Sequence, residues 1–237
     1  MLRPFLLFRR ALKDIWSEFG LMTLCSLLWC IFSLPLPALA LLVLIDGAVL
    51  LAVPVLLAAV LPLAPATGAL YAIAYRTIEG EATKRRDFFK QMRPHVVQGW
   101  LLTGTWMLGT IALVVSGTVY STMANLVGLV LALLLRLLLV LWLALPLYGF
   151  ALFQLHEAPT VRGVASTALL MVLGRPFYTL VVLLITGVLL VLSVWLPFLL
   201  LAFTPGLLAI WNIHLTRALI EEAHALRAAH LQEDTKE

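Results

Sequence analysis

Charged side chains are scarce in this chain of 237 residues. They make up 12% of it, whereas 63% is hydrophobic, and the mean hydropathy is +1.06. A soluble domain carries about 25% charged residues, so half of the usual polar cover is missing. This amount of charge does not cover a globule in water, but a surface in lipid needs no such cover. The composition therefore predicts an all-α integral membrane protein.

Cysteines and catalytic motifs are also scarce. Cys25 and Cys30 lie five residues apart in one apolar stretch, so a helix places them on different faces. Apolar packing explains both thiols better than a disulfide framework or a metal site. The sequence contains no G-x-x-x-x-G-K-[ST], no G-x-S-x-G and no paired acids within its apolar stretches. We therefore expect no enzyme activity, no catalytic residue, no cofactor and no bound metal.

Long apolar stretches are abundant, and they predict a six-transmembrane-helix bundle that forms a single membrane domain over 1–237. One span needs about 20 apolar residues. The breaks between paired spans fall at "LIDGAV" around Asp46, at "SGTVYSTMAN" (116–125) and at Pro197. The predicted spans are 20–45, 47–76, 96–117, 124–152, 176–196 and 198–220.

The positions of Lys and Arg agree with an even number of spans. Of the 16 such residues, four precede the first span, six lie at 76–95, two at 156–175 and three after position 216. Arg76 and Arg217 fall at the cytoplasmic ends of two predicted spans, only Arg136 lies in the interior of one, and the three alternate connections contain no Lys or Arg. Because positive charge accumulates in cytoplasmic loops, both termini are expected in the cytoplasm. The same loops explain the net charge of +4 without a nucleic-acid partner.

Amphipathic segments at the chain start and in the 77–95 loop predict contact with the membrane surface. Residues 1–19 should form an interfacial helix, with Phe5, Phe8, Leu12, Ile15 and Trp16 on one face and basic residues on the other. In the basic cytoplasmic loop 77–95, Phe88, Phe89 and Met92 oppose Lys84, Arg85 and Lys90. Such a helix suits anionic lipid headgroups, and docking of a cytoplasmic partner is the alternative. The tail 221–237 reads as a cytoplasmic helical extension.

The second span combines prolines with small residues. Pro54, Pro62 and Pro65 each remove a backbone donor, and lipid cannot satisfy the carbonyls that this frees. Ala64 and Gly68 are spaced for close approach of another helix. We expect a kinked and tightly packed segment here. The alternative is a discontinuous helix that binds a substrate, as in some transporters.

Three segments together resemble the YesL-like family of bacterial membrane proteins, a domain of unknown function. They are "SLLWCIFSLP" (26–35), "APATGALYAIAYRTIEGE" (64–81) and "DFFKQMRPHVVQGW" (87–100). Gly68 stands where the family usually has Ala, and about twenty extra residues (38–61) separate the first two motifs. The residues that match the family motif, with Gly68 beside them, are Trp29, Pro65, Ala66, Thr67, Gly68, Ala69, Leu70, Tyr71, Gly80, Glu81, Asp87, Phe88 and Phe89.

The resemblance implies a location in the bacterial inner (plasma) membrane, but it implies no reaction. Genes of this family often accompany carbohydrate ABC importers, so it points to a partner of that type.

Arg136, in "LALLLRLLLVLW", is a candidate intramembrane polar site. A guanidinium there is expensive and suggests a function, yet no acid in another span is an obvious mate. It could pair structurally or snorkel to the interface, or it could contact a substrate or a lipid headgroup.

Two functions remain open on the sequence. The first is a non-catalytic accessory or structural subunit of a bacterial membrane complex, which meets lipid and either another membrane protein or a second copy of itself. The second is a small-solute transporter or channel built around the kinked second span and Arg136. A transport path would need several polar groups that converge near the midplane, and the sequence offers one Arg with scattered Thr and Ser.

Overall fold

The computed structural model describes residues 4–94, 96–123, 125–156 and 159–234, in which all regular structure is α-helical. Four helical stretches there are long and apolar enough to cross a membrane: Val49–Ile78, Val96–Ser121, Leu126–Leu155 and Pro176–Trp195. A fifth arises if α1 (Pro4–Ser17) and α2 (Phe19–Ser33), bent by 99°, count as one span. This confirms the all-α fold class and agrees with an integral membrane protein.

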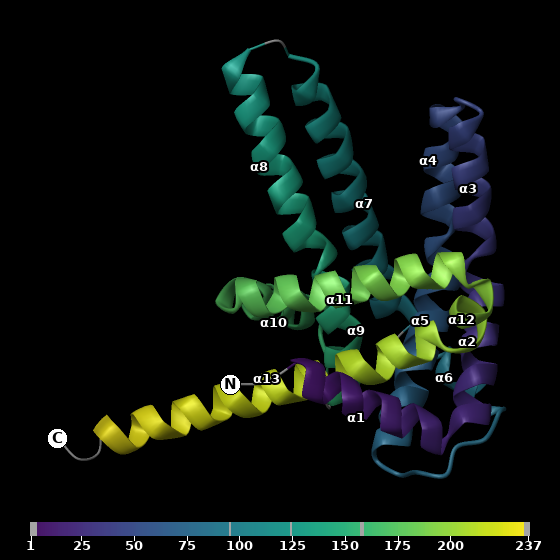
Figure 1. Cartoon of the computed structure of the whole chain (residues 1–237), viewed down its shortest axis with the longest axis vertical. Helices are drawn as coiled ribbons and strands as arrows, with labels where there is room; N and C mark the ends of the chain where they lie inside the picture. Colours follow the sequence, from purple (N-terminus) through teal and green to yellow (C-terminus); the bar gives the residue numbers. More distant parts are fainter. Residues whose placement is uncertain (1–3, 95, 124, 157–158, 235–237) are drawn as a thin grey trace.

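The first two predicted spans form a helical hairpin (Figure 1). Its first arm is α2 followed by α3 (Pro35–Ile45), and its second arm is α4 (Val49–Ala58) followed by α5 (Val60–Ile78). The turn lies at Asp46–Ala48, as predicted, where Gly47 has a φ of +79° that L side chains rarely adopt. Pro35 begins a new helix, so the predicted span 20–45 is divided into two helices rather than continuous.

The second hairpin joins α7 (Val96–Ser121) to α8 (Leu126–Leu143) and α9 (Leu145–Leu155). The Asn125 side chain caps α8 by accepting a hydrogen bond from the backbone N–H of Gly128 at 2.7 Å. Trp106 and Trp142 then bond crosswise: the indole Nε1 of each donates to the backbone carbonyl of the other, at 3.3 and 3.0 Å. The two arms are therefore fastened near their lower ends.

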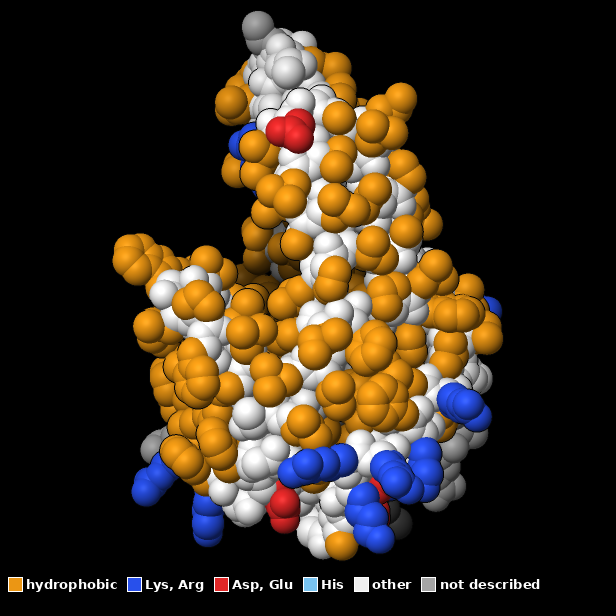
Figure 2. Space-filling model, turned by 90° about the vertical axis from the view of Figure 1, so that its right-hand side faces the viewer, with side chains coloured by type: hydrophobic (Ala, Val, Ile, Leu, Met, Phe, Trp, Pro, Cys, Tyr) orange, Lys and Arg blue, Asp and Glu red, His pale blue; other side chains and the backbone are white. Residues whose placement is uncertain are grey.

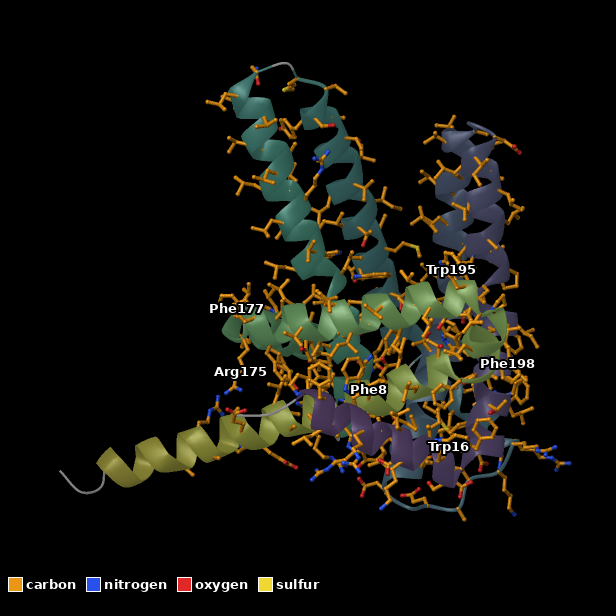
Figure 3. All side chains as sticks on the ribbon, viewed as in Figure 1. Phe8, Trp16, Arg175, Phe177, Trp195 and Phe198 are labelled. Atoms are coloured by element: carbon orange, nitrogen blue, oxygen red, sulfur yellow. The ribbon has the colours of Figure 1, made fainter. Side chains whose placement is uncertain are left out.

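The rest of the chain does not continue this parallel arrangement. After α10 (Val161–Gly174), α11 (Pro176–Trp195) runs across the direction of the two hairpins, and so does α13 (Thr204–Asp234) (Figure 1). The short helix α12 (Pro197–Ala202) joins them, so the predicted span 198–220 is divided. α13 continues as one helix through most of the predicted tail, to Asp234. Arg175, at the start of α11, forms a bidentate ion pair with Glu222 of α13 (Figure 3).

The centre of the fold is the first half of α13. Trp211 is fully buried there, and Phe8 of α1 meets it edge-on at 5.3 Å between ring centroids. The Asp14 carboxylate and the His214 ring, 2.6 Å apart, also join α1 to α13. On α1, Ile15 is buried, unlike the predicted interfacial position, because the helix packs on α13. Trp16 remains 67% exposed, so α1 has one face in the core and another open to its surroundings.

The surface differs strongly between its two ends. Hydrophobic side chains cover the hairpins, which rise as a column, whereas most Lys and Arg side chains on this face gather at the base (Figure 2). The arms of the second hairpin bury few of their side chains: in an apolar segment of 18 residues within Leu126–Leu155, 11% of the residues are buried. An apolar surface of this extent is suited to lipid or to another apolar protein surface.

Candidate functional site

A cavity of about 620 Å³ lies where the two hairpins meet the crossing helices. Its walls come from α2, α5, α7, α8, α9, α10, α11 and α13. Leucine, tryptophan and other apolar side chains form most of the wall, and threonines contribute isolated hydroxyls. Among the described residues that line it, none is Asp, Glu, Lys, Arg or His. The site is therefore suited to a molecule that is mainly hydrocarbon.

Several residues of the sequence motif lie in this wall. The Trp29 indole of α2 donates a hydrogen bond to the Thr67 hydroxyl of α5 at 3.0 Å. That hydroxyl donates in turn to the Leu63 carbonyl at 2.7 Å, one turn earlier on the same helix. Leu70 and Tyr71 line the same cavity one turn further along. The motif thus fastens α2 to α5 and shapes one side of the cavity.

Tyr71 is also bonded to the helix at the centre of the fold. The Asn212 side-chain nitrogen of α13 donates to its hydroxyl at 2.7 Å, and both residues are buried. Asn212 was absent from the sequence-based candidates. The signal that could have found it is an amide in the apolar run "LLAIWNIHL" (207–215), since a buried amide needs a partner.

The carbonyl that Pro65 frees is satisfied by the neighbouring hairpin. A proline nitrogen cannot donate to the carbonyl four residues earlier, which is that of Leu61. The Trp100 indole of α7 donates to the Leu61 carbonyl at 3.0 Å. This is the type of compensation that a proline inside a membrane helix needs, and the sequence did not identify Trp100 as its source.

Close packing of α5 on α7 occurs at Ala64 rather than at Gly68. A Cβ built on Gly99 of α7 would lie 3.7 Å from the Ala64 Cβ, so the helices approach closely there. A Cβ on Gly68 would meet no heavy atom within 4 Å. Gly68 and Pro65 instead line a second cavity, of about 110 Å³. Ala66 and Ala69 are fully buried in the body of the protein.

The loop residues of the motif lie at the base of the first hairpin, in a separate cluster. Gly80 has a φ of +73°, and Glu81 lies 3.7 Å from Arg76. The Asp87 carboxylate accepts a hydrogen bond from the Lys84 backbone N–H at 2.8 Å, and this bond lowers the pKa of the Asp87 carboxyl below its ordinary value.

The structure divides the aromatic pair of the loop. Phe88, in α6 (Asp87–Gln91), is fully buried in the protein core, whereas Phe89 is 51% exposed. The prediction that this segment contacts the membrane surface through Phe88 as well as Phe89 is therefore wrong for Phe88. The Phe88 ring packs in the hydrophobic core of the protein, and of the two rings only that of Phe89 is exposed to lipid or to a partner.

Arg136 lies apart from all of these residues. Its side chain is exposed on α8, it lines neither cavity, and it has no ion-pair or hydrogen-bond partner in the described part of the chain. The proline-containing helix α5 lines both cavities and Arg136 lines neither, so the two candidate features of the spans do not form one site.

Comparisons of the chain with protein-family models, with curated proteins and with solved structures give no match. The resemblance to the YesL-like family stays a prediction from its motif residues.

Proposed function

We propose that the chain is a non-catalytic subunit of a complex in the bacterial inner membrane, which it crosses six times with both termini in the cytoplasm. The two hairpins supply four crossings, through α2–α3, α4–α5, α7 and α8–α9. The other two crossings require α11 and α12–α13, which lie across the hairpin direction in Figure 1, to pass through the membrane at a steep tilt. The concentration of Lys and Arg at the base (Figure 2) supports this orientation.

Single cysteines test this topology. Arg85→Cys and Gln232→Cys should react with an impermeant reagent from the cytoplasmic side, and Thr118→Cys from the opposite side. The native Cys25 and Cys30 are buried and give a low background. Labelling of the cysteine at position 118 from the cytoplasmic side alone would contradict the topology.

The observation that carries the subunit function is the exposed guanidinium of Arg136. It lies ten residues into α8, about 15 Å along the helix at 1.5 Å per residue. That is about half the thickness of a bilayer hydrocarbon core. A central arginine costs about 2.5–3.5 kcal/mol on insertion scales. Since the described residues supply no partner for it, an acid of another subunit or a lipid headgroup is needed to offset the cost.

The surroundings of Arg136 favour a protein partner. Leu129, Leu133 and Leu137, its neighbours on the same side of α8, are more than half exposed, and they form a continuous apolar surface with the arginine. An apolar helix face that carries one charge is complementary to a helix that carries one acid. The family resemblance suggests a carbohydrate ABC importer as the complex to test first.

Co-purification in mild detergent tests this function. The tagged wild-type chain should retain a stoichiometric membrane partner, and Arg136→Leu should lose it while folding as well as the wild type or better. Arg136→Lys, which keeps the charge, is the matched control and should retain the partner in part. Wild-type chain that purifies alone from its native membrane would overturn the proposal.

The transporter alternative predicts a different response. A transport path needs polar groups that converge, and Arg136 lies outside the cavity that Thr67 lines. If the alternative held, Arg136→Leu would abolish uptake into reconstituted vesicles and would leave any co-purifying partner in place.

A further inference from the structure

Two charged side chains of opposite sign lie in the long apolar stretches, and neither has a partner. Asp46 is the only Asp, Glu, Lys or Arg in 20–75, and Arg136 is the only one in 96–155. Both are exposed. The Asp46 carboxylate, like the Arg136 guanidinium, forms no ion pair or side-chain hydrogen bond with the described residues. A charge in apolar surroundings is costly without a partner, so each of the two favours contact with a charge of opposite sign.

The height of Asp46 follows from the length of its hairpin. The Trp100 indole of α7 donates to the Leu61 carbonyl of α5, so the two hairpins are level there. Val49, where α4 begins, is twelve residues from Leu61, which is about 18 Å at 1.5 Å per residue. The turn at Asp46 lies directly beyond Val49. Asp46 is therefore about 20 Å above the contact between Leu61 and Trp100.

The height of Arg136 is nearly the same, because the second hairpin is the longer one (Figure 1). Gly117 is seventeen residues beyond Trp100 on α7, about 25 Å along the helix. A Cβ built on Gly117 would lie 4.0 Å from the Cβ of Leu135, the residue next to Arg136 on α8. The heights of the two charges thus differ by no more than about one helical turn, 5.4 Å. In Figure 2, an acidic and a basic side chain lie at one height on the apolar column, far above the charged base.

A second copy of the chain supplies the opposite charge for each. Copies that insert with the same topology have equal residues at equal depth, so Asp46 of one copy is level with Arg136 of the next. The surroundings also match, since each charge is bordered by apolar side chains that are more than half exposed. They are Ile45, Val49, Leu50, Leu133 and Leu137. Contact between the two hairpins would therefore bury apolar surface around the ion pair.

The positions of the two charges determine the kind of contact. Both hairpins rise from the same set of crossing helices (Figure 1). A two-fold axis along the membrane normal that formed both ion pairs of a dimer would pass midway between the hairpins and through these helices, so the two copies would overlap. The contact is therefore head-to-tail, with the first hairpin of one copy against α8 of the next. Such a contact closes into a ring or extends as a row.

We propose that copies of this chain associate head-to-tail in the membrane through an ion pair between Asp46 of one copy and Arg136 of the next. The proposal rests on the subunit function above and names the partner at Arg136. That partner is a second copy, because every copy carries an acid at the required height with an apolar border.

Cross-linking between copies tests the position of the contact. Chains with Ile45→Cys and chains with Leu137→Cys carry different tags, keep both charges and are co-expressed, and a short bismaleimide is added to the membranes. The mixture should give a cross-linked dimer with both tags. Either chain alone should give little, because equal residues do not meet in a head-to-tail contact, and the native Cys25 and Cys30 are buried.

Leu126→Cys is the matched control for Leu137→Cys. It is also an exposed leucine of α8, but it lies eleven residues, about 16 Å, nearer the tip of the hairpin. It should therefore not cross-link to Ile45→Cys.

Variants of the acid test the ion pair. Loss of one member of a buried charge pair weakens association by on the order of thirtyfold, so Asp46→Asn should reduce co-purification of two differently tagged copies in nanodiscs. Asp46→Glu, which keeps the charge, should retain most of it. The exchanged variant, Asp46→Arg with Arg136→Asp, should restore the association that each single change removes. If the exchanged variant does not insert, Asp46→Asn against Asp46→Glu decides alone.

Two results would contradict the proposal: cross-linking of Ile45→Cys to Leu126→Cys as strong as to Leu137→Cys, or association of Asp46→Asn as strong as that of the wild type. If a tagged copy retains a different membrane protein through Arg136 and no second copy, the subunit function stands and the head-to-tail contact is wrong. If it retains neither, both are wrong.

Discussion

Replacement of Gly109 by alanine should destabilise the protein, although alanine is normally the better helix residue. A Cβ built on Gly109 of α7 would lie 2.6 Å from the Cε2 atom and 3.0 Å from the Nε1 atom of the Trp142 ring. The ring cannot move without loss of the hydrogen bond that its Nε1 donates to the Trp106 carbonyl. Gly109 is thus the space into which this crossed tryptophan pair fits.

The expected loss of stability in Gly109→Ala combines one stabilising effect with two destabilising effects. Alanine in place of glycine favours a helix by up to about 1 kcal/mol. Overpacking of a fitted site costs about 1–3 kcal/mol, and loss of the one interhelical hydrogen bond that the ring donates costs about 0.6 kcal/mol in a membrane. Gly109→Ala should therefore lower the free energy of unfolding by about 1–3 kcal/mol.

The assay is equilibrium unfolding of the full chain in mixed detergent micelles. Gly104→Ala is the internal reference, because a Cβ there meets nothing within 4 Å on the same helix, and it should be neutral or stabilising. Trp142→Leu should cost stability alone, yet in combination with Gly109→Ala it should remove most of the alanine penalty. If Gly109→Ala stabilises as much as Gly104→Ala, the close fit inferred at this crossing is wrong.

Three further predictions concern polar contacts. Asn212→Ala should lower the free energy of unfolding by about 1–3 kcal/mol, because the buried Tyr71 hydroxyl loses its donor. The double variant Tyr71→Phe with Asn212→Leu should lose less stability than the two single variants added together, and thermal unfolding measures all three. Arg175→Gln should cost below about 1 kcal/mol, since the pair with Glu222 is about one-third exposed, and added salt should shrink the difference. Because the Asp87 carboxylate has a lowered pKa, it stabilises its loop at pH values above the ordinary aspartate pKa of 3.8. This stabilisation is lost as the pH falls below 3.8 and the carboxylate takes up a proton. Hydrogen exchange of the loop should show this pH dependence in the wild type and not in Asp87→Asn.

Local features of the fold were predictable because local sequence determines them. Asp46 with Gly47 ends an apolar run with a polar and flexible pair, and the turn lies there. Pro197 follows the end of α11 as predicted, because a proline is favoured at the first turn of a helix. The second hairpin turns after the end of α7 at Ser121, near the end of the predicted break, since Asn125 supplies the cap that starts α8.

Long-range features were not predictable, because hydropathy does not record direction or partners. Residues 198–220 are apolar enough for a span, yet α13 crosses below the hairpins and buries Trp211 in the core. The cavity also depends on where α11 crosses, and no sequence pattern specifies that. The Thr67 and Tyr71 positions were recognised from a motif, but their partners Trp29 and Asn212 are 38 and 141 residues away, and only the fold brings them together.

The central place of α13 has a consequence for the order in which the protein can assemble. Synthesis runs from the N-terminus, so both hairpins leave the ribosome and enter the membrane before Leu207–Thr216, the most buried part of the helix, exists. Until then Phe8, Tyr71 and Asp14 lack their partners on α13. A chain that ends before position 204 should therefore insert its hairpins normally yet remain loosely associated and open to quality-control proteases. The helix that closes the fold is thus made only after both hairpins.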